Sequence, residues 1–86
     1  MLKEKMKKSI TLRYFASLQE QTQKSTETMV TELETYRELY SFLAAHYGFL
    51  LSPCQIKVAV NDEFEHLDQP ILNQATIVFI PPVAGG

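Results

Sequence analysis

The sequence has little cysteine and no long apolar run, and both absences restrict the kinds of protein it can encode. Its single cysteine, Cys54, cannot form a disulfide within the chain and has no metal-ligating neighbours at useful spacing. We therefore expect a buried or half-buried structural thiol. No apolar run approaches the length of a membrane span, and residues 1–8 lack the apolar centre of a signal peptide. These features favour a cytoplasmic protein without a membrane partner.

Motifs that would carry catalysis or hold a metal are also missing. The sequence contains no glycine-rich phosphate loop, no nucleophile elbow, no HExxH pattern and no paired carboxylates at catalytic spacing. Glu32 with Glu34, and Glu63 with Glu65, alternate by two residues, which is typical of solvated strand faces. We expect a protein that is not an enzyme by itself and that holds no metal and no permanently bound cofactor.

Length and composition predict one globular domain with a single modest core. The chain has 86 residues, of which 45% are hydrophobic and 21% charged. Its net charge of −2 is unevenly distributed: residues 1–8 hold four lysines and one glutamate, which leaves four basic and nine acidic residues over 9–86. We interpret residues 1–8 as a disordered, solubilising lead rather than a nucleic-acid-binding arm. The acidic remainder favours protein partners with basic surfaces.

Alternation of apolar and polar side chains predicts several strands separated by short connections. Residues 9–15 alternate cleanly, with Phe15 as the apolar exception on the otherwise polar face. Further strands are predicted at residues 26–33, 56–60, 64–67 and 76–80. Between them we expect a loop or one short helical turn at 16–25, a connection at 49–55, a turn at 61–63 and a crossover at 68–75.

One helix is predicted with both a start and a stop signal. Thr35 and Glu38 form a capping box, in which the threonine hydroxyl accepts a hydrogen bond from the third helical amide and the glutamate reaches back. Gly48 is suited to a left-handed cap. The apolar residues between them recur at three-and-four spacing and are expected in the core: Tyr36, Leu39, Tyr40, Phe42, Leu43 and Tyr47. The predicted class is α+β, with a mixed sheet packed on one main helix.

The last residues combine rigidity with small size. Pro81 and Pro82 cannot continue a hydrogen-bonded ladder, so we expect them to turn the chain off the sheet. Residues 81–86 could extend about 20 Å into a cleft on another protein, where Gly85 and Gly86 have no Cβ that would clash. A terminal carboxylate, with a pKa of about 3.5, must be activated before it can react. The tail predicts a carrier whose catalyst lies elsewhere; an ordinary frayed terminus is the alternative.

Several segments together resemble the small subunits of molybdopterin synthase, which are ubiquitin-like sulfur carriers with the β-grasp fold. The matching residues are 12–16, Thr35, Glu38, Leu39, 58–61 and 78–86. Ubiquitin-like modifiers and thiazole-pathway carriers share a terminal Gly-Gly, whereas the ending with two prolines is specific. The resemblance implies a β-grasp with a flexible Gly-Gly tail.

The resemblance also implies a chemical role for the C-terminus. In that family an adenylyltransferase related to ubiquitin-activating enzymes uses ATP to adenylate the terminal glycine, here Gly86, which then becomes a thiocarboxylate. The tail enters the large subunit of molybdopterin synthase, and its sulfur passes to cyclic pyranopterin monophosphate to build the molybdopterin dithiolene. Two small and two large subunits form a heterotetramer. Gly85 would give the narrow approach, and the rigid insert would comprise Pro81, Pro82, Val83 and Ala84.

A docking surface is expected beside the tail. Alternation places Phe15 and Ile80 on the sheet face away from the helix, and Phe64 follows the predicted turn. In the family, such positions contact the partner. Three exposed hydrophobic residues beside the tail would form a contiguous patch; the alternative is that they merely cover the sheet as scattered surface residues.

Two positions depart from the family pattern. Asn73, Gln74 and Ala75 stand where Asp-Gly-Asp is usual, so either Asn73 adopts a positive φ or the turn has a different shape. Gln19 stands where an arginine is common.

Three other functions would use the same features. A protein modifier would conjugate its C-terminus to lysines. A thiazole-pathway carrier would deliver the same sulfur to a different acceptor, although the Pro81-Pro82 ending and the longer chain argue against it. A structural adaptor would tolerate an added C-terminal residue, which a carrier would not.

Overall fold

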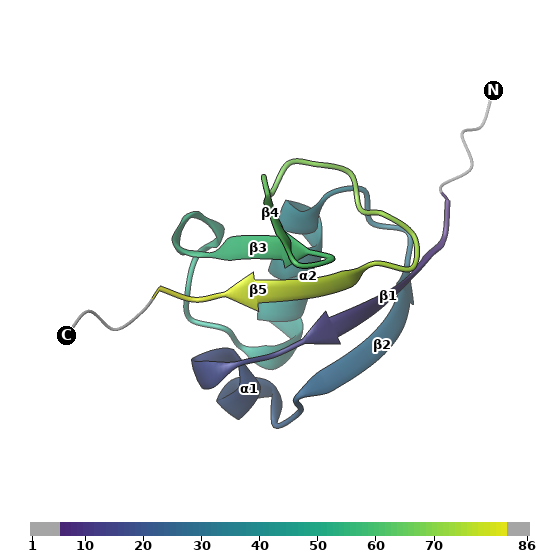
Figure 1. Cartoon of the computed structure of the whole chain (residues 1–86). Coiled ribbons are helices and arrows are strands. Elements are labelled where there is room, and N and C mark those ends of the chain that lie inside the picture. Colours follow the sequence, from purple (N-terminus) through teal and green to yellow (C-terminus); the bar gives the residue numbers. More distant parts are fainter. Residues whose placement is uncertain (1–5, 83–86) are drawn as a thin grey trace.

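A mixed sheet packed against one long helix forms the body of the protein, for which the computed structural model describes residues 6–82 (Figure 1). The elements in chain order are β1 Lys8–Arg13, α1 Ala16–Thr22, β2 Thr26–Thr31, α2 Tyr36–Tyr47, the 3₁₀ turn η1 Pro53–Gln55, β3 Lys57–Val60, β4 Glu63–Glu65 and β5 Thr76–Ile80. The strand order is β2-β1-β5-β3-β4, in which only the β1–β5 pair is parallel. The predicted α+β class is confirmed.

The core lies between α2 and one face of the sheet. The strands contribute alternate side chains to it, including Leu12, Val58 and Ile77, all of which are fully buried. The helix contributes Tyr36, Leu39, Tyr40 and Leu43. α2 therefore covers this face of the sheet and leaves the other face open.

The helix α2 begins and ends as the sequence predicts. The Oγ1 of Thr35 accepts from the amide of Glu38 (3.2 Å), and a carboxylate oxygen of Glu38 accepts from the amide of Thr35 (3.1 Å). Gly48 closes the helix in the left-handed region, with a φ of 77°. The capping box and the glycine cap are therefore confirmed.

The prediction that Phe42 lies in the core is wrong. Its side chain is 49% exposed. At 100° per residue, Phe42 lies roughly 120° from the centre of the stripe that contains Tyr40 and Leu43, so it falls outside the arc that the sheet covers. Phe42 does follow Leu39 by three residues, but α2 buries a narrower stripe of side chains than this spacing rule predicts.

Several bounds differ from the predictions. β1 begins at Lys8, a residue that composition placed in the lead. Lys8 pairs with Thr31 of β2, and its ammonium also donates to the carbonyl of Leu33 (2.7 Å). β2 ends at Thr31 rather than at residue 33, β3 begins one residue late, and β4 is limited to Glu63–Glu65. β5 has the predicted bounds.

The segment predicted as a loop or one helical turn contains a seven-residue helix, α1. Burial of Leu18 and Thr22 holds it against the body, which a short polar sequence does not reveal. It follows the extended residue Phe15 and ends at Gln23, whose φ of 60° forms a left-handed cap. This helix fixes the direction in which the chain leaves Phe15.

The turn before β5 has a positive φ, but at Gln74 (63°) rather than at Asn73. Asn73 instead uses its side chain, whose Oδ1 accepts from the amide of Ser9 (2.8 Å). The turn therefore ties the start of β5 to β1 through the asparagine amide and places the strained backbone on the next residue.

Candidate functional site

The strand β5 carries the root of the C-terminal tail. It is a central strand, paired with β1 on one side and β3 on the other, and Ile77 and Phe79 anchor it in the core. Pro81 is half-buried and Pro82 exposed, and since neither has a backbone N–H the ladder ends at Ile80. The predicted site residues Val83, Ala84, Gly85 and Gly86 lie outside the described residues.

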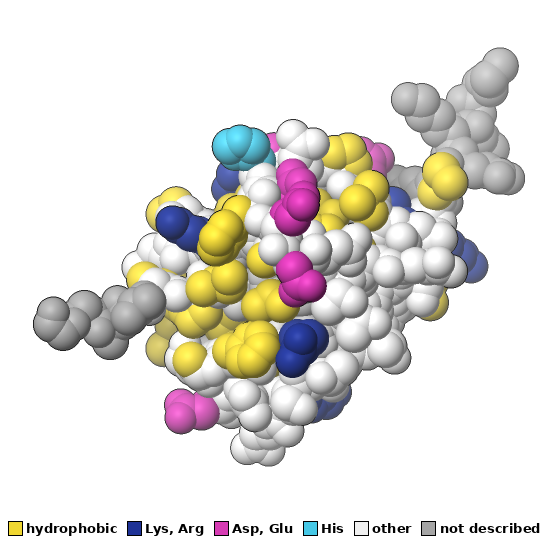
Figure 2. Space-filling view, viewed as in Figure 1, with side chains coloured by type: hydrophobic (Ala, Val, Ile, Leu, Met, Phe, Trp, Pro, Cys, Tyr) yellow, Lys and Arg dark blue, Asp and Glu magenta, His cyan; other side chains and the backbone are white. Residues whose placement is uncertain are grey.

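Beside this root, apolar side chains meet on the face of the sheet away from α2. Phe64 of β4 lies opposite Ala59 of β3, which lies opposite Val78 of β5. Val78 pairs in turn with Arg13, the last residue of β1. Phe15 follows Arg13 by two residues and Ile80 follows Val78 by two residues, so alternation keeps both on this side of the sheet. We call the five apolar residues the sheet-face patch: Phe15, Ala59, Phe64, Val78 and Ile80. Figure 2 shows hydrophobic side chains gathered on this face toward the end from which the tail leaves.

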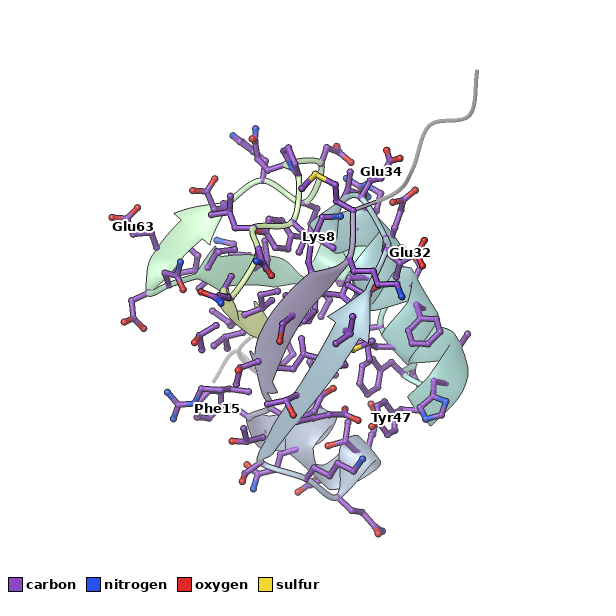
Figure 3. The ribbon with its side chains drawn as sticks, turned by 90° about the vertical axis from the view of Figure 1, so that its right-hand side faces the viewer. Lys8, Phe15, Glu32, Glu34, Tyr47 and Glu63 are labelled. Atoms are coloured by element: carbon purple, nitrogen blue, oxygen red, sulfur yellow. The ribbon has the colours of Figure 1, made fainter. Side chains whose placement is uncertain are left out.

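The structure thus brings together the three predicted docking residues. Phe64 is 71% exposed and Phe15 45% exposed, while Ile80 is partly covered. Phe15 points outward from the side of the molecule opposite the helix (Figure 3). A contiguous patch, rather than scattered exposure, is the arrangement typical of an interface.

Charged groups border the sheet-face patch. The guanidinium carbon of Arg13 lies 5.3 Å from the centre of the Phe15 ring, a cation–π arrangement that holds the ring at the edge of the patch. Lys57 is paired with Ile80, and the exposed Glu63 and Glu65 flank Phe64 in β4. The patch therefore has a basic side near the tail root and an acidic side at β4.

The sequence predictions did not include Ala59 as a member of the patch, nor Arg13 as a charged residue at its border. Alternation alone assigns both to the open face, but their positions depend on which strands are neighbours. β5 is inserted between β1 and β3, a long-range pairing that the spacing of residues within each strand does not specify.

A partly buried hydrogen-bond network includes Tyr14, the residue before Phe15. One carboxylate oxygen of Glu27 accepts from the hydroxyls of Tyr14 (2.8 Å) and Tyr47 (2.7 Å), and the other accepts from the ammonium of Lys24 (3.2 Å). Burial, and then the hydrogen bond to Glu27, raise the pKa of Tyr14 far above its usual range. Partial burial opposes ionisation of Glu27, but hydrogen bonds from Tyr47, Tyr14 and Lys24 outweigh it, so the pKa of Glu27 is lowered. The network joins Tyr14, the residue after β1, to Glu27 of β2 and Tyr47 of α2.

Cys54 is exposed, which corrects the predicted buried or half-buried thiol. Pro53 begins the surface turn η1 there, and the Cys54 sulfur lies 3.0 Å from the hydroxyl oxygen of Ser52. It lines an open groove of about 560 Å³ together with Phe64 and His66.

Over residues 6–82, no group of three or more histidine, cysteine or acidic residues is arranged to hold a metal ion. Neither helix in this range is long and apolar enough to cross a membrane.

Comparison with known proteins assigns the class. The five-stranded mixed sheet wrapped around one helix, with a tail leaving its central strand, is the β-grasp of ubiquitin-like proteins, as in the solved structures below. The chain belongs to the ThiS family of ubiquitin-like sulfur carriers, whose model matches residues 12–86. No curated protein matches the chain significantly.

Three solved structures illustrate the similarity. SAMP1 from Haloferax volcanii, a small archaeal modifier protein, is 22% identical, with a TM-score of 0.73 over 91% of this chain and 99% of that one. A putative molybdopterin converting factor subunit 1 from Pyrococcus furiosus is 16% identical, with a TM-score of 0.71 over 88% and 99%. A chain in the complex of subunits 1 and 2 of molybdopterin-converting factor from Helicobacter pylori is 24% identical, with a TM-score of 0.58 over 91% and 99%. These similarities establish the β-grasp fold.

Proposed function

We propose that this protein is the sulfur-carrier subunit of a molybdopterin synthase and acts in molybdenum cofactor biosynthesis. The observation that carries the proposal is the position of the tail root: Pro81 and Pro82 leave a central strand beside the sheet-face patch. A partner that binds the patch would thereby receive the tail in a fixed direction. Membership of the ThiS family and the likeness to molybdopterin converting factor subunits support this reading.

The reactive group would be the carboxylate of Gly86. An adenylyltransferase of the ubiquitin-activating type would join it to AMP from ATP and release pyrophosphate. A sulfide-level donor would then displace AMP and leave a terminal thiocarboxylate. Transfer of that sulfur to cyclic pyranopterin monophosphate would return the carboxylate, and two such transfers would supply the two sulfur atoms of the dithiolene. The chain itself would supply the carrier and its positioning, and the partner the remaining catalytic groups.

The sheet-face patch is where the large subunit of the synthase would bind. Phe15, Phe64 and Ile80 would enter apolar depressions on that subunit, while the tail residues Gly85 and Gly86 would pass into its cleft because they lack side chains. We extend the proposal to the heterotetramer of two small and two large subunits and to a cytoplasmic location. ATP would be used by the activating enzyme and not held by this chain.

A second candidate, conjugation of the C-terminus to lysines of other proteins, is favoured by the likeness to SAMP1. A thiazole-pathway carrier is the related alternative within the family that matches. The three candidates share activation of Gly86 and differ in the acceptor, so they are separated by what the activated chain becomes attached to.

The experiment is an intact-mass measurement after incubation with ATP, a matching activating enzyme and a sulfur donor. We expect a gain equal to the exchange of one oxygen for one sulfur, localised to the terminal peptide. Deleting Gly86, or adding one residue after it, should abolish transfer to cyclic pyranopterin monophosphate in the presence of the large subunit and leave the circular dichroism spectrum unchanged. The matched control adds the same residue before Met1. Transfer by either altered tail would contradict the carrier model, and isopeptide-linked species would favour the modifier.

A further inference from the structure

The chain passes from β1 into α1 through an elbow at Ala16, and the backbone of this elbow is strained. The φ of Ala16 is 51°, in the left-handed region, where the Cβ of an L-residue crowds the following carbonyl oxygen. Asparagine and aspartate tolerate that region because their side chains can hydrogen-bond locally, but alanine has no such group. The elbow therefore holds a conformation that its own residue type disfavours.

A helix start does not require this conformation. An extended N-cap normally leads directly into right-handed helix, with a φ of about −63°. The N-cap Phe15 is extended, with φ −132° and ψ 159°, yet Ala16 has a positive φ. Elsewhere in residues 6–82, non-glycine residues with a positive φ lie at a helix cap or in a tight turn: Gln23, Asn61, Asp62 and Gln74. The helix cap and the tight turns explain those values, but neither explains the value at Ala16.

The chain is fixed on both sides of the elbow. Tyr14 and Leu18 are both buried in the core, and only three residues join them. The carbonyl of Phe15 accepts hydrogen bonds from the amides of Leu18 (3.1 Å) and Gln19 (3.3 Å). The elbow therefore cannot relax its strain by a local movement without breaking these bonds or exposing a core residue.

The side chain of Ala16 does not offset the strain by burial, because the residue is exposed. Glycine would adopt the same φ at no steric cost. What alanine adds at this position is restriction, since its Cβ removes most of the backbone conformations that are open to glycine. The restricted bond rotations lie next to the Phe15–Ala16 peptide, so they limit the directions in which Phe15 can point.

We propose that Ala16 is a positioning residue, whose strained backbone holds Phe15 in the orientation that a partner of the sheet-face patch meets. Phe15 is 45% exposed and points outward (Figure 3). An exposed ring loses conformational freedom when a partner binds it, and a ring that is already held in place loses less. The elbow thereby raises affinity without adding a contact. The inference rests on the proposed function in taking that partner to be the large subunit of the synthase.

The first test compares Ala16→Gly with Gln23→Gly, a matched control that removes the same kind of strain from the other end of α1. Nuclear magnetic relaxation of the free chain should show order parameters that fall from about 0.85 toward 0.6 for the amide of residue 16 and for the Phe15 side chain in Ala16→Gly alone. Neither variant should lower the urea midpoint of unfolding, because relief of strain offsets the greater freedom of the unfolded chain.

The second test is calorimetric titration of the same chains with a matching large subunit. Ala16→Gly should weaken binding roughly two- to tenfold, the cost of immobilising one side chain, whereas Gln23→Gly should bind like the wild type. In a Phe15→Ala background, Ala16→Gly should have no further effect, because a residue that acts through Phe15 then has nothing to position.

Three results would overturn the proposal. These are unchanged order parameters in Ala16→Gly, an affinity loss that Gln23→Gly shares equally, and a loss that persists in the Phe15→Ala background. Failure of the proposed function is recognised separately, because the wild-type chain would then not bind the large subunit at all. In that case the relaxation measurement alone decides: a Phe15 that stays rigid in Ala16→Gly rejects Ala16 as its positioning residue, and a loosened Phe15 supports it.

Discussion

The sheet-face patch and the edge strand β2 both expose apolar side chains, but their backbones differ in hydrogen bonding. In the patch, Val78 belongs to a strand that is paired on both sides, so only side chains are available to a partner. At the edge, Val30 belongs to a strand that is paired on one side alone within residues 6–82. A partner of the patch must therefore match its shape and charge, whereas a partner of the edge would also have to match a strand register.

The largest effect is expected at the patch. Phe64→Ala should lower the affinity for a matching large subunit roughly 10- to 100-fold, because an exposed aromatic side chain that fills a partner's pocket is a typical hot spot. Isothermal titration calorimetry would measure it. Val30→Lys, a change on the edge strand β2 outside the patch, should leave this affinity unchanged. Equal losses from both variants would show that the loss does not come from the patch.

An intermediate effect is expected at Glu27, whose carboxylate accepts hydrogen bonds from the hydroxyls of Tyr14 and Tyr47. Glu27→Gln should lower the free energy of unfolding by about 1–2 kcal/mol at pH 7, since it removes the charge from these hydrogen bonds. The pKa of Glu27 is lowered in the folded chain, so the carboxylate stabilises the fold above its unfolded pKa of about 4.3, and this stabilisation is lost as the pH falls through the folded value.

Urea denaturation of wild type and Glu27→Gln between pH 7 and pH 3 would check this dependence. The difference between the two proteins should shrink as the pH falls. A difference that stays constant across this range would mean that the glutamate acts through packing rather than through its charge.

The smallest effect is expected at Phe42 in the monomer. Phe42→Ala should change the free energy of unfolding by less than about 1 kcal/mol, because half of the side chain is exposed and little contact is lost. The neighbouring Leu43→Ala should cost about 2–5 kcal/mol, because Leu43 is buried against the sheet. Thermal unfolding of both variants at micromolar concentration makes the comparison. Equal destabilisation would place Phe42 in the core.

Local patterns predicted most of the elements correctly. The capping box at Thr35, the glycine cap at Gly48 and the bounds of β5 all depend on signals within a few residues, and each is confirmed. The resemblance to ubiquitin-like sulfur carriers rested on a longer stretch of matched residues, and the family match over 12–86 confirms it. Alternation placed Phe15 and Ile80 on the open face and the turn placed Phe64 after it, while their role in docking stays a prediction.

The remaining features depend on contacts between distant segments. Leu18 belongs to no periodic apolar pattern in the sequence, and it is buried because α1 packs against the rest of the domain. Cys54 is a residue type that is usually buried, but it falls on a surface turn that Pro53 begins. The positive φ lies at Gln74 and not at Asn73, whose side chain accepts a hydrogen bond from the amide of Ser9, 64 positions away. None of these contacts is encoded by a local spacing.

The position of β5 has a mechanical consequence. A pull on the tail acts along the strand axis, while the ladder bonds to β1 and β3 lie across it, so many bonds bear the load together in shear. A tail rooted in an edge strand such as β2 would be held by one ladder instead of two, so fewer bonds would share the load. The central placement therefore lets the tail be drawn into a cleft and pulled out again without unravelling the domain to which it is attached.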